Sequence, residues 1–386
     1  MLNRTIIYRL SALAVILLAG VACVKLSTYS DAEKVPVGFS VYSPTVPGSK
    51  ADPAFYVPST RIPAGGEIAV YAWYHDNSGW EADKTTLNPN FMYRQYVKND
   101  TSNPDAPNFV YSPVKYWPNE SSDSLSFWAL YPFHKVGDAD PALPAGLVLY
   151  ASGGSTPYGP DSAGLPVVEY TASYVPKEQI DLLFSEMKAD QSKPAVGGKV
   201  DLRFRHVMSK ILFNVTNSSE DLPVGASVLV KSLTVTNIYT KATCSNPSAS
   251  IASAAQAEAF WSAASVAHDI IINPAVDPDV ELGTSEAVLL VMPQSILSTA
   301  QLTLTYDIGF VAADDPDDFI TYSTNIVSNI PLWRDSDGVH SAYGVKKWLA
   351  GRQYQYNIEA GLEKIEFSEV VSTNWIWNPA DEVLIN

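Results

Sequence analysis

One histidine stands in an alternating, strand-like stretch and is the first residue to test for chemistry. His206 lies within residues 200–215 and shares one side of that stretch with Phe204 and Met208. An imidazole serves as a metal ligand or general base when a second His, Cys or carboxylate stands at a suitable spacing. No such residue stands at a ligand or triad spacing around His206. We therefore predict a structural role, with the ring hydrogen-bonded by a carbonyl of a neighbouring strand.

Two acidic runs carry the ligand type that calcium prefers. They are Asp314, Asp315, Asp317 and Asp318, and Asp335-Ser-Asp337-Gly338. A calcium loop of the helix-loop-helix type needs ligands at several further positions and a closing Glu, which both runs lack. The chain also has no GxSxG motif, no phosphate-binding glycine loop and no HExxH. We predict solvated turns at both runs, no metal, no cofactor and no enzymatic activity.

Several aromatic residues cluster in the first hundred positions and offer a possible sugar-stacking platform. They are Tyr71, Trp73, Tyr74, Trp80, Tyr93 and Tyr96. Because most of them fall within strand patterns, packing in the core or between strands is the better interpretation.

The first residues indicate export. Arg4 and Arg9 precede an apolar run over residues 10–21, which is too short for a stable membrane anchor and ends in small residues before Cys23. Residues 20–23 resemble a relaxed bacterial lipoprotein box. We predict a signal peptide over residues 1–22 and a lipid on Cys23, which becomes the mature N-terminus. Cys244 then has no intrachain partner, so we predict a buried free thiol and no disulfide.

Composition favours a β-rich protein with two cores. The chain has 386 residues, and single cores rarely grow beyond about 250 residues. Hydrophobic residues make up 46% and charged residues 17%, which excludes a disordered chain, and the 21 Tyr, 13 Phe and 9 Trp suit sheets. The formal net charge of −16 argues against nucleic acid as a partner.

Periodicity predicts strands along most of the chain, with a loop or insertion at residues 137–164. Residues 251–267 are predicted to form the one helix or, equally, a flexible loop. The predicted strands cover residues 35–42, 67–73, 88–97, 108–116, 124–131, 179–184, 200–215, 227–235, 286–292, 301–310, 353–362 and 364–371. Within residues 200–215 the apolar side changes, which predicts a bulge near Ser209 and Lys210. The polar residues 216–223 are the best linker. We predict an N-terminal domain over residues 23–217 and a C-terminal domain over residues 218–386.

An ordered set of short segments now carries a resemblance. The segments are NFM at 90–92, YSPVKYWP at 111–118, LSFWALYP at 125–132, QIDLLF at 179–184, VDLRFRHVMSKI at 200–211, MPQ at 292–294, WLAG at 348–351 with Tyr354 and Tyr356, and VSTNW at 371–375. Taken in order, they resemble the fimbrillin family, the subunits of type V pili. The resemblance covers nearly all of the mature chain.

This resemblance implies two tandem transthyretin-like β-sandwich domains on a lipoprotein that travels to the outer membrane and cell surface. In pilus-forming members a trypsin-like Arg or Lys protease removes the first strand, and a strand of the next subunit replaces it. Such an addition satisfies unpaired N–H and C=O groups at a sheet edge. Carried over, residues 35–42 are the removable strand and Arg61 is the cleavage point, with Lys50 and Lys34 as weaker choices. Residues 371–386, with Val371, Trp375 and Trp377, are the donor.

Three functions remain open at this point. The first is a structural pilus subunit whose partners are other pilus subunits, the processing protease and, through the lipid on Cys23, the outer membrane. The second is a tip adhesin or anchor that binds a glycan or a host protein. The third is a surface enzyme or glycan-capture lipoprotein, since a sequence alone cannot pair carboxylates that lie far apart in the chain.

Overall fold

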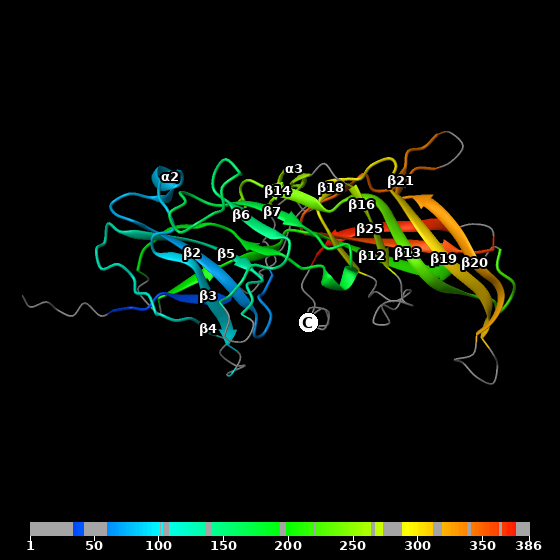
Figure 1. The fold of residues 1–386 in the computed structure, drawn as a ribbon, viewed down its shortest axis with the longest axis horizontal. Coiled ribbons are helices and arrows are strands. Elements are labelled where there is room, and N and C mark those ends of the chain that lie inside the picture. Colours follow the sequence, from blue (N-terminus) through cyan, green and yellow to red (C-terminus); the bar gives the residue numbers. More distant parts are fainter. Residues whose placement is uncertain are drawn as a thin grey trace, which may run out of the picture.

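In a computed structural model of the chain, the described secondary-structure elements are nearly all β-strands (Figure 1). The structure describes residues 34–41, 60–100, 102, 108–135, 140–193, 198–218, 221–263, 267–272, 288–311, 319–337, 341–362 and 365–375. Cys23, Trp377 and the acidic run 314–318 therefore lie outside the described residues, as does the signal peptide. In the described ranges no helix is long and apolar enough to cross a membrane.

The largest sheet of the N-terminal half has seven strands, in the spatial order β11-β8-β5-β2-β3-β4 with β9 also paired to β5. They are β2 (Glu67–His75), β3 (Met92–Asp100), β4 (Asn108–Val110), β5 (Ser124–Tyr131), β8 (Leu183–Ser185), β9 (Lys188–Gln191) and β11 (Phe204–His206). The predicted hairpin over residues 88–116 is confirmed as β3 and β4. The strand predicted over residues 179–184 begins later, because the 3-10 helix η1 (Pro176–Glu178) precedes it.

The central strands of this sheet are buried on both faces, which explains their nearly continuous apolar sequences. On β5, Trp128 and Leu130 belong to a core on one face, whereas Phe127 and Ala129 belong to a core on the other. The first core, the inner core, lies between this sheet and a second one. The second core, the outer core, is covered by a parallel pair of short strands, β1 (Gly38–Val41) and β10 (Lys199–Leu202).

The second sheet of the N-terminal half has the order β15-β14-β7-β6. Its strands are β6 (Leu147–Tyr150), β7 (Val167–Thr171), β14 (Lys241–Cys244) and β15 (Ser262–Ala263). The glycine- and proline-rich stretch predicted to be a loop thus contains β6, because Leu147 and Leu149 are buried in the inner core. The strands β14 and β15 lie beyond the predicted boundary in the sequence, yet β14 pairs with β7 and β15 pairs with β14. A single cut near residue 217 therefore does not separate the cores.

The C-terminal half consists of two four-stranded sheets with a third core between them. One sheet, in the order β17-β12-β24-β25, contains β12 (Ser209–Asn217), β17 (Val288–Val291), β24 (Arg352–Ala360) and β25 (Ile365–Asn374). The other, in the order β16-β13-β19-β20, contains β13 (Ser227–Tyr239), β16 (Ala267–Ile272), β19 (Gln301–Val311) and β20 (Phe319–Pro331). Figure 1 shows β13, β19 and β20 at the opposite end of the molecule from β2, β3 and β4.

Residues 199–217, predicted to contain one strand with a bulge, form the three strands β10, β11 and β12, and their side chains enter three cores. Phe204 on β11 belongs to the outer core, Met208 to the inner core, and Phe213 on β12 to the C-terminal core. The apolar side changes because the chain passes from one half of the molecule to the other between β11 and β12. β12 then pairs in parallel with β24, which places it in the C-terminal half.

The remaining elements are short. They are the helices α2 (Trp80–Asp83) and α3 (Ala254–Ala259) and the strand pairs β18 (Gln294–Ser295) with β23 (Lys347–Trp348), and β21 (Trp333–Arg334) with β22 (Tyr343–Gly344). The helix predicted over residues 251–267 is therefore only the six residues of α3. It begins where the Ser253 side chain caps the backbone N–H of Gln256, and the strands β15 and β16 follow.

Candidate functional site

The first strand lies between two segments that come from distant parts of the chain. On one side β1 runs parallel to β10, with Gly38 opposite Lys199 and Phe39 opposite Val200. On the other side, the Val37 N–H donates to the Lys115 carbonyl over 2.8 Å, and the Trp117 N–H donates to the Val35 carbonyl over 3.0 Å. We call the site that these two segments form, together with the outer core below, the β1 groove.

Two side chains of the first strand fill the groove. Val37 and Phe39 are each 1% exposed and belong to the outer core. The Phe39 ring lies 5.8 Å from that of Tyr111 and 6.0 Å from that of Phe127, measured between centroids. The Tyr111 hydroxyl donates to the Val37 carbonyl over 2.6 Å. The strand predicted over residues 35–42 is thus found as β1, and the side chains of Val37 and Phe39 lie buried beneath it.

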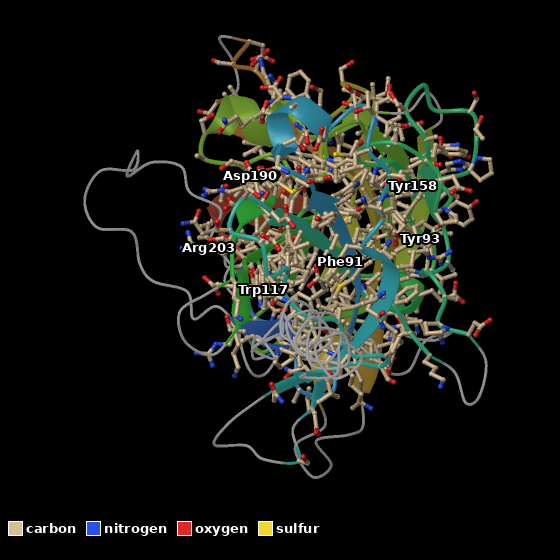
Figure 2. All side chains as sticks on the ribbon, turned by 90° about the vertical axis from the view of Figure 1, so that its left-hand side faces the viewer. Phe91, Tyr93, Trp117, Tyr158, Asp190 and Arg203 are labelled. Carbon is tan, nitrogen blue, oxygen red and sulfur yellow. The ribbon has the colours of Figure 1, made fainter. Side chains whose placement is uncertain are left out.

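The backbone conformation at Gly198 allows the first strand to approach closely. Its φ of +61° is a left-handed conformation, and a Cβ there would lie 2.5 Å from the Pro36 oxygen. Its carbonyl accepts hydrogen bonds from the Gly38 N–H and from the Trp117 indole N–H, both over 2.9 Å. Figure 2 shows Trp117 apart from Tyr93 and Tyr158, which lie close together and pack on the inner core.

The predicted cleavage point lies where the chain enters the seven-stranded sheet. The Arg61 side chain is exposed, whereas Ile62 is 4% exposed and belongs to the outer core. The preceding residue, Thr60, forms an isolated bridge with Phe204, and its N–H donates to the Phe204 carbonyl over 2.7 Å. Because β1 precedes Arg61, cutting there would separate the groove-filling strand from the rest of the chain.

The predicted donor begins inside the folded body. Val371 lies on β25 opposite Gln355 of β24, and Trp375 is 4% exposed with its N–H bonded to the Gly351 carbonyl over 3.2 Å. Both residues therefore already have intrachain partners, so a donor that begins at Val371 would require β25 to leave its sheet. The rest of the predicted donor, residues 376–386, lies outside the described part of the chain.

Comparisons with known proteins agree with this architecture. The sequence profile of a family described as fimbrillin-like matches residues 57–375. The chain belongs to the fimbrillin-like family. The Fimbrium subunit Fim1C of Phocaeicola vulgatus is 23% identical over 192 residues, which cover 48% of this chain and 46% of that protein. The match thus spans about half the length of this relative.

A solved structure shares the fold of this fimbrillin-like chain. It is a fimbrial protein from Bacteroides vulgatus, with a TM-score of 0.52 and 18% sequence identity. The superposition covers 80% of this chain and 92% of that protein. The family profile confirms the predicted family, and this structure agrees with the predicted all-β fold.

The histidine singled out from the sequence of this fimbrillin-like chain is structural, but its partner differs from the prediction. His206 is 3% exposed, and its Nδ1 lies 2.9 Å from a carboxylate oxygen of Asp181, which takes the place of the expected strand carbonyl. Its ring stacks on that of Trp375, with 3.9 Å between centroids and 12° between planes. The sequence gives no signal for either contact, because both partners are remote along the chain.

A second histidine stands in a triad-like arrangement that the sequence analysis missed. The His75 Nε2 lies 2.9 Å from the Ser126 Oγ, and its Nδ1 lies 2.8 Å from the Asp83 Oδ2. Hydrogen bonds from the Ser78 hydroxyl and the His75 ring lower the pKa of Asp83. However, His75 and Ser126 are both 0% exposed, and the Ser126 oxygen already accepts from the Asp190 N–H. A substrate cannot reach this serine, so the network ties α2 and β9 to the sheet.

We expect the Ser126→Ala substitution to lower the free energy of unfolding without affecting any hydrolysis. It leaves the Asp190 N–H without its acceptor and His75 without one partner, which costs about 1–3 kcal/mol. Urea denaturation of the two proteins measures this loss. An ester-hydrolysis assay provides the control, because a catalytic Ser126 would give the unsubstituted chain an activity that the variant lacks.

The clustered aromatics of this fimbrillin-like chain pack in its core, as predicted. Tyr71 and Trp73 are 0% exposed and Trp80 is 7% exposed, and the Tyr71 ring lies 5.3 Å from that of Trp128. Cys244 is a buried free thiol, also as predicted, and burial raises its pKa to about 12. In the second acidic run, Asp335 pairs with Lys346 over 2.7 Å. The described residues contain no group of three or more His, Cys, Asp or Glu that could hold a metal ion.

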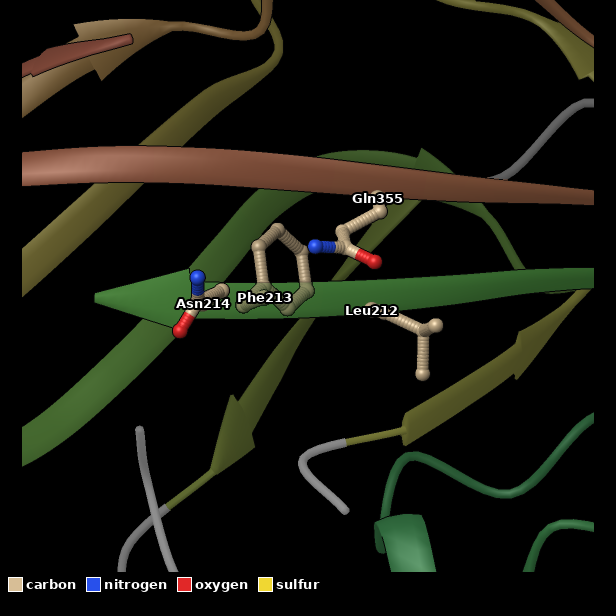
Figure 3. Close-up of a pocket in the computed structure, with 4 residues that line it drawn as sticks. All are labelled: Leu212, Phe213, Asn214 and Gln355. Carbon is tan, nitrogen blue, oxygen red and sulfur yellow. The ribbon is translucent and has the colours of Figure 1, made fainter. Parts of the chain in front are cut away.

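A small hollow lies over the β12–β24 pair, in the C-terminal half (Figure 3). Its volume is about 200 Å³, and it is lined by Leu212, Phe213, Asn214 and Gln355. The two amides face a shared partner, since the Gln355 Nε2 and the Asn214 Nδ2 lie 2.9 Å and 3.3 Å from the Asn357 Oδ1. The lining has no charged group and no nucleophile, so the β1 groove is the stronger candidate site.

Proposed function

We propose that this chain is a structural subunit of a cell-surface pilus and that it polymerises by strand exchange at the β1 groove. The observation that carries the proposal is the position of β1. It covers the outer core, yet it precedes the exposed Arg61, and among the described residues its backbone pairs only with residues 198–202 and with the 115–117 segment. It is therefore a strand that the rest of the fold can lose and replace.

Loss of this strand would leave unpaired hydrogen-bonding groups and exposed apolar surface in the β1 groove. The carbonyls of Lys115 and Gly198 would lose the N–H donors of Val37 and Gly38, and the pockets of Val37 and Phe39 would open to water. Unpaired edge groups and exposed apolar surface both favour the addition of an extended segment. A strand from a second copy of this chain pairs with these groups, covers this surface and links the two subunits.

In the folded chain, the residues on both sides of Arg61 limit the access of a protease to the peptide bond after it. A protease binds its substrate as an extended segment, whereas Thr60 is held to Phe204 and Ile62 is buried. The proline at position 63 stiffens the chain further. Cleavage by a trypsin-like protease therefore requires the segment around Arg61 to open locally, so we expect processing to be slow compared with cleavage of an unfolded peptide.

The donor we propose is the part of the predicted segment that follows Trp375, residues 376–386. It includes Trp377 and ends in Val383-Leu384-Ile385-Asn386. Val383 and Ile385 are two positions apart, as are Val37 and Phe39, and therefore point to the same face of a strand. They can fill the two pockets that the removed strand leaves.

The remaining features of the proposal concern the route to the surface. We infer that residues 1–22 are a signal peptide, that Cys23 carries a lipid in the outer membrane, and that the two halves are tandem transthyretin-like sandwiches. The export pattern in the sequence and the family membership support this. The lipid anchor holds the precursor at the membrane until cleavage at Arg61 releases the remainder for assembly.

The first experiment is the intact mass of the protein released from the native cell surface. We expect a chain that begins at Ile62, which would mean that β1 is removed. The Arg61→Gln variant should keep the lipidated start at Cys23, whereas the Lys34→Gln variant, altered at a weaker site, should be processed normally. A native protein that keeps Cys23 throughout would contradict the polymerising subunit and favour an uncut anchor or a monomeric surface binder of a glycan or host protein.

A further inference from the structure

The end of the last strand is held in the opposite half of the molecule. Trp375 directly follows β25, a strand of the C-terminal sheet, yet its side chain belongs to the inner core of the N-terminal half. From this geometry we propose that Trp375 is a positioning residue, which fixes the point and direction at which the C-terminal segment leaves the body. The proposal rests on the pilus function inferred above and adds the element that presents the donor.

Trp375 is enclosed by groups from three segments. The His206 ring of β11 stacks on the indole at 3.9 Å, and the Lys210 Nζ at the start of β12 lies 5.9 Å from the ring centroid. Behind the stack, Asp181 holds the His206 ring through its Nδ1 over 2.9 Å. The Gly351 carbonyl accepts the Trp375 N–H, and the Gly351 N–H donates in turn to the Met208 carbonyl over 2.9 Å.

These contacts make a joint between the two halves. His206 ends β11 in the seven-stranded sheet, and Lys210 lies in β12, so the indole contacts both sides of the crossover between the halves. Flat stacking on an imidazole and a cation near the ring both add attraction beyond the burial of apolar surface. The backbone at residue 375 therefore cannot move without breaking contacts in both halves.

A fixed starting point matters for a short donor. Residues 376–386 are eleven residues, with an extended reach of about 36 Å at roughly 3.3 Å per residue. A donor that is held in the direction in which it docks loses less conformational freedom on binding than one whose attachment point also moves. Freeing Trp375 would let the end of β25 fray. The donor would then keep its sequence but lose its fixed orientation.

The test uses two proteins that can form a single contact. An uncut chain has its groove filled and can act only as a donor, whereas a protease-processed chain that lacks residues 376–386 can act only as an acceptor. Mixing them gives one kind of heterodimer, whose dissociation constant is measured by sedimentation. We expect Trp375→Ala in the donor to raise this constant about tenfold or more, because a donor with a mobile attachment point loses more conformational entropy on binding. The same substitution in the acceptor should leave it unchanged.

Two further variants separate positioning from stability. Trp375→Phe keeps an aromatic ring over His206 and should restore most of the affinity. Trp80→Ala removes an indole that is also buried, at 7% exposed, and lies in the same inner core, where it packs on Trp73 and not on the crossover. It should lower the unfolding midpoint of the donor without weakening the heterodimer.

Each outcome has a distinct meaning. If the unsubstituted donor and acceptor do not associate at all, the pilus proposal fails, and with it the role of Trp375. If they associate and the Trp375→Ala donor binds as tightly as the unsubstituted donor, the pilus proposal stands and Trp375 is not a positioning residue. Equal weakening by Trp80→Ala would likewise overturn it, since both substitutions would then act through general loss of packing.

Discussion

Deleting residues 376–386 is expected to abolish polymerisation of the processed chain while leaving the folding of the uncut chain nearly unchanged. These residues follow Trp375, and none of the described strands includes them, so their loss breaks no strand pairing that the structure describes. The processed deletion chain keeps an open groove but has no donor to offer. Size-exclusion chromatography of the processed protein should therefore show monomers alone.

The longer deletion, of residues 371–386, is a poor substitute for this experiment. It removes Val371–Asn374 from β25, where they pair with Arg352–Gln355, and it also removes the buried Trp375. Loss of a buried Trp alone costs about 3–5 kcal/mol, so a failure to polymerise would not distinguish a missing donor from a damaged domain.

Point variants within the donor give a matched control. Val383→Asp and Ile385→Asp would place a charge in the apolar pockets of Val37 and Phe39, and each should weaken polymerisation strongly. Asp381→Asn changes one charge at a position outside that pair and should have little effect. A processed chain that still forms polymers without residues 376–386 would show that the donor lies elsewhere. If the chain is a tip subunit, which offers no donor, deleting residues 376–386 should leave its assembly onto the pilus unchanged.

The sequence was most informative where both faces of a strand are buried. Residues 124–131 read as one apolar strand, and all eight residues of β5 are buried. The exposed strands were harder to recognise. β16 and β20 were missed, and β20 is rich in Ser, Thr and Asn, with Ile320 and Val327 each 58% exposed, so that it lacks the apolar alternation of a half-buried strand.

The hydrophobic periodicity of the sequence does not predict where the chain crosses from one core to another, for a different reason. A change of apolar side within residues 200–215 fits either a bulge or a move to a new core, because the pattern records which residues are buried and not what covers them. The contacts of His206 show the same limit. Asp181 lies 25 residues before it, and Trp375 enters from another strand, so that only the fold brings them together.

The uncut chain and the polymer should also respond differently to one substitution. Phe39→Ala removes a fully buried ring from the β1 groove and should lower the unfolding free energy of the uncut chain by about 3–5 kcal/mol. The same substitution should not alter polymers built from processed chains, because residue 39 leaves with the first strand. Chemical denaturation of the uncut chain and thermal dissociation of the polymer measure the two effects.

Phe127→Ala is the matched control, since its ring faces Phe39 across the groove but stays with the body after cleavage. It should destabilise the uncut chain by a similar amount and also weaken the polymer, because an incoming strand would pack on the cavity it leaves. Polymers that lose stability with Phe39→Ala would mean that β1 remains in the assembled subunit, which contradicts exchange at this groove. Polymers that respond only to Phe127→Ala would identify the outer core as the surface on which the donor docks.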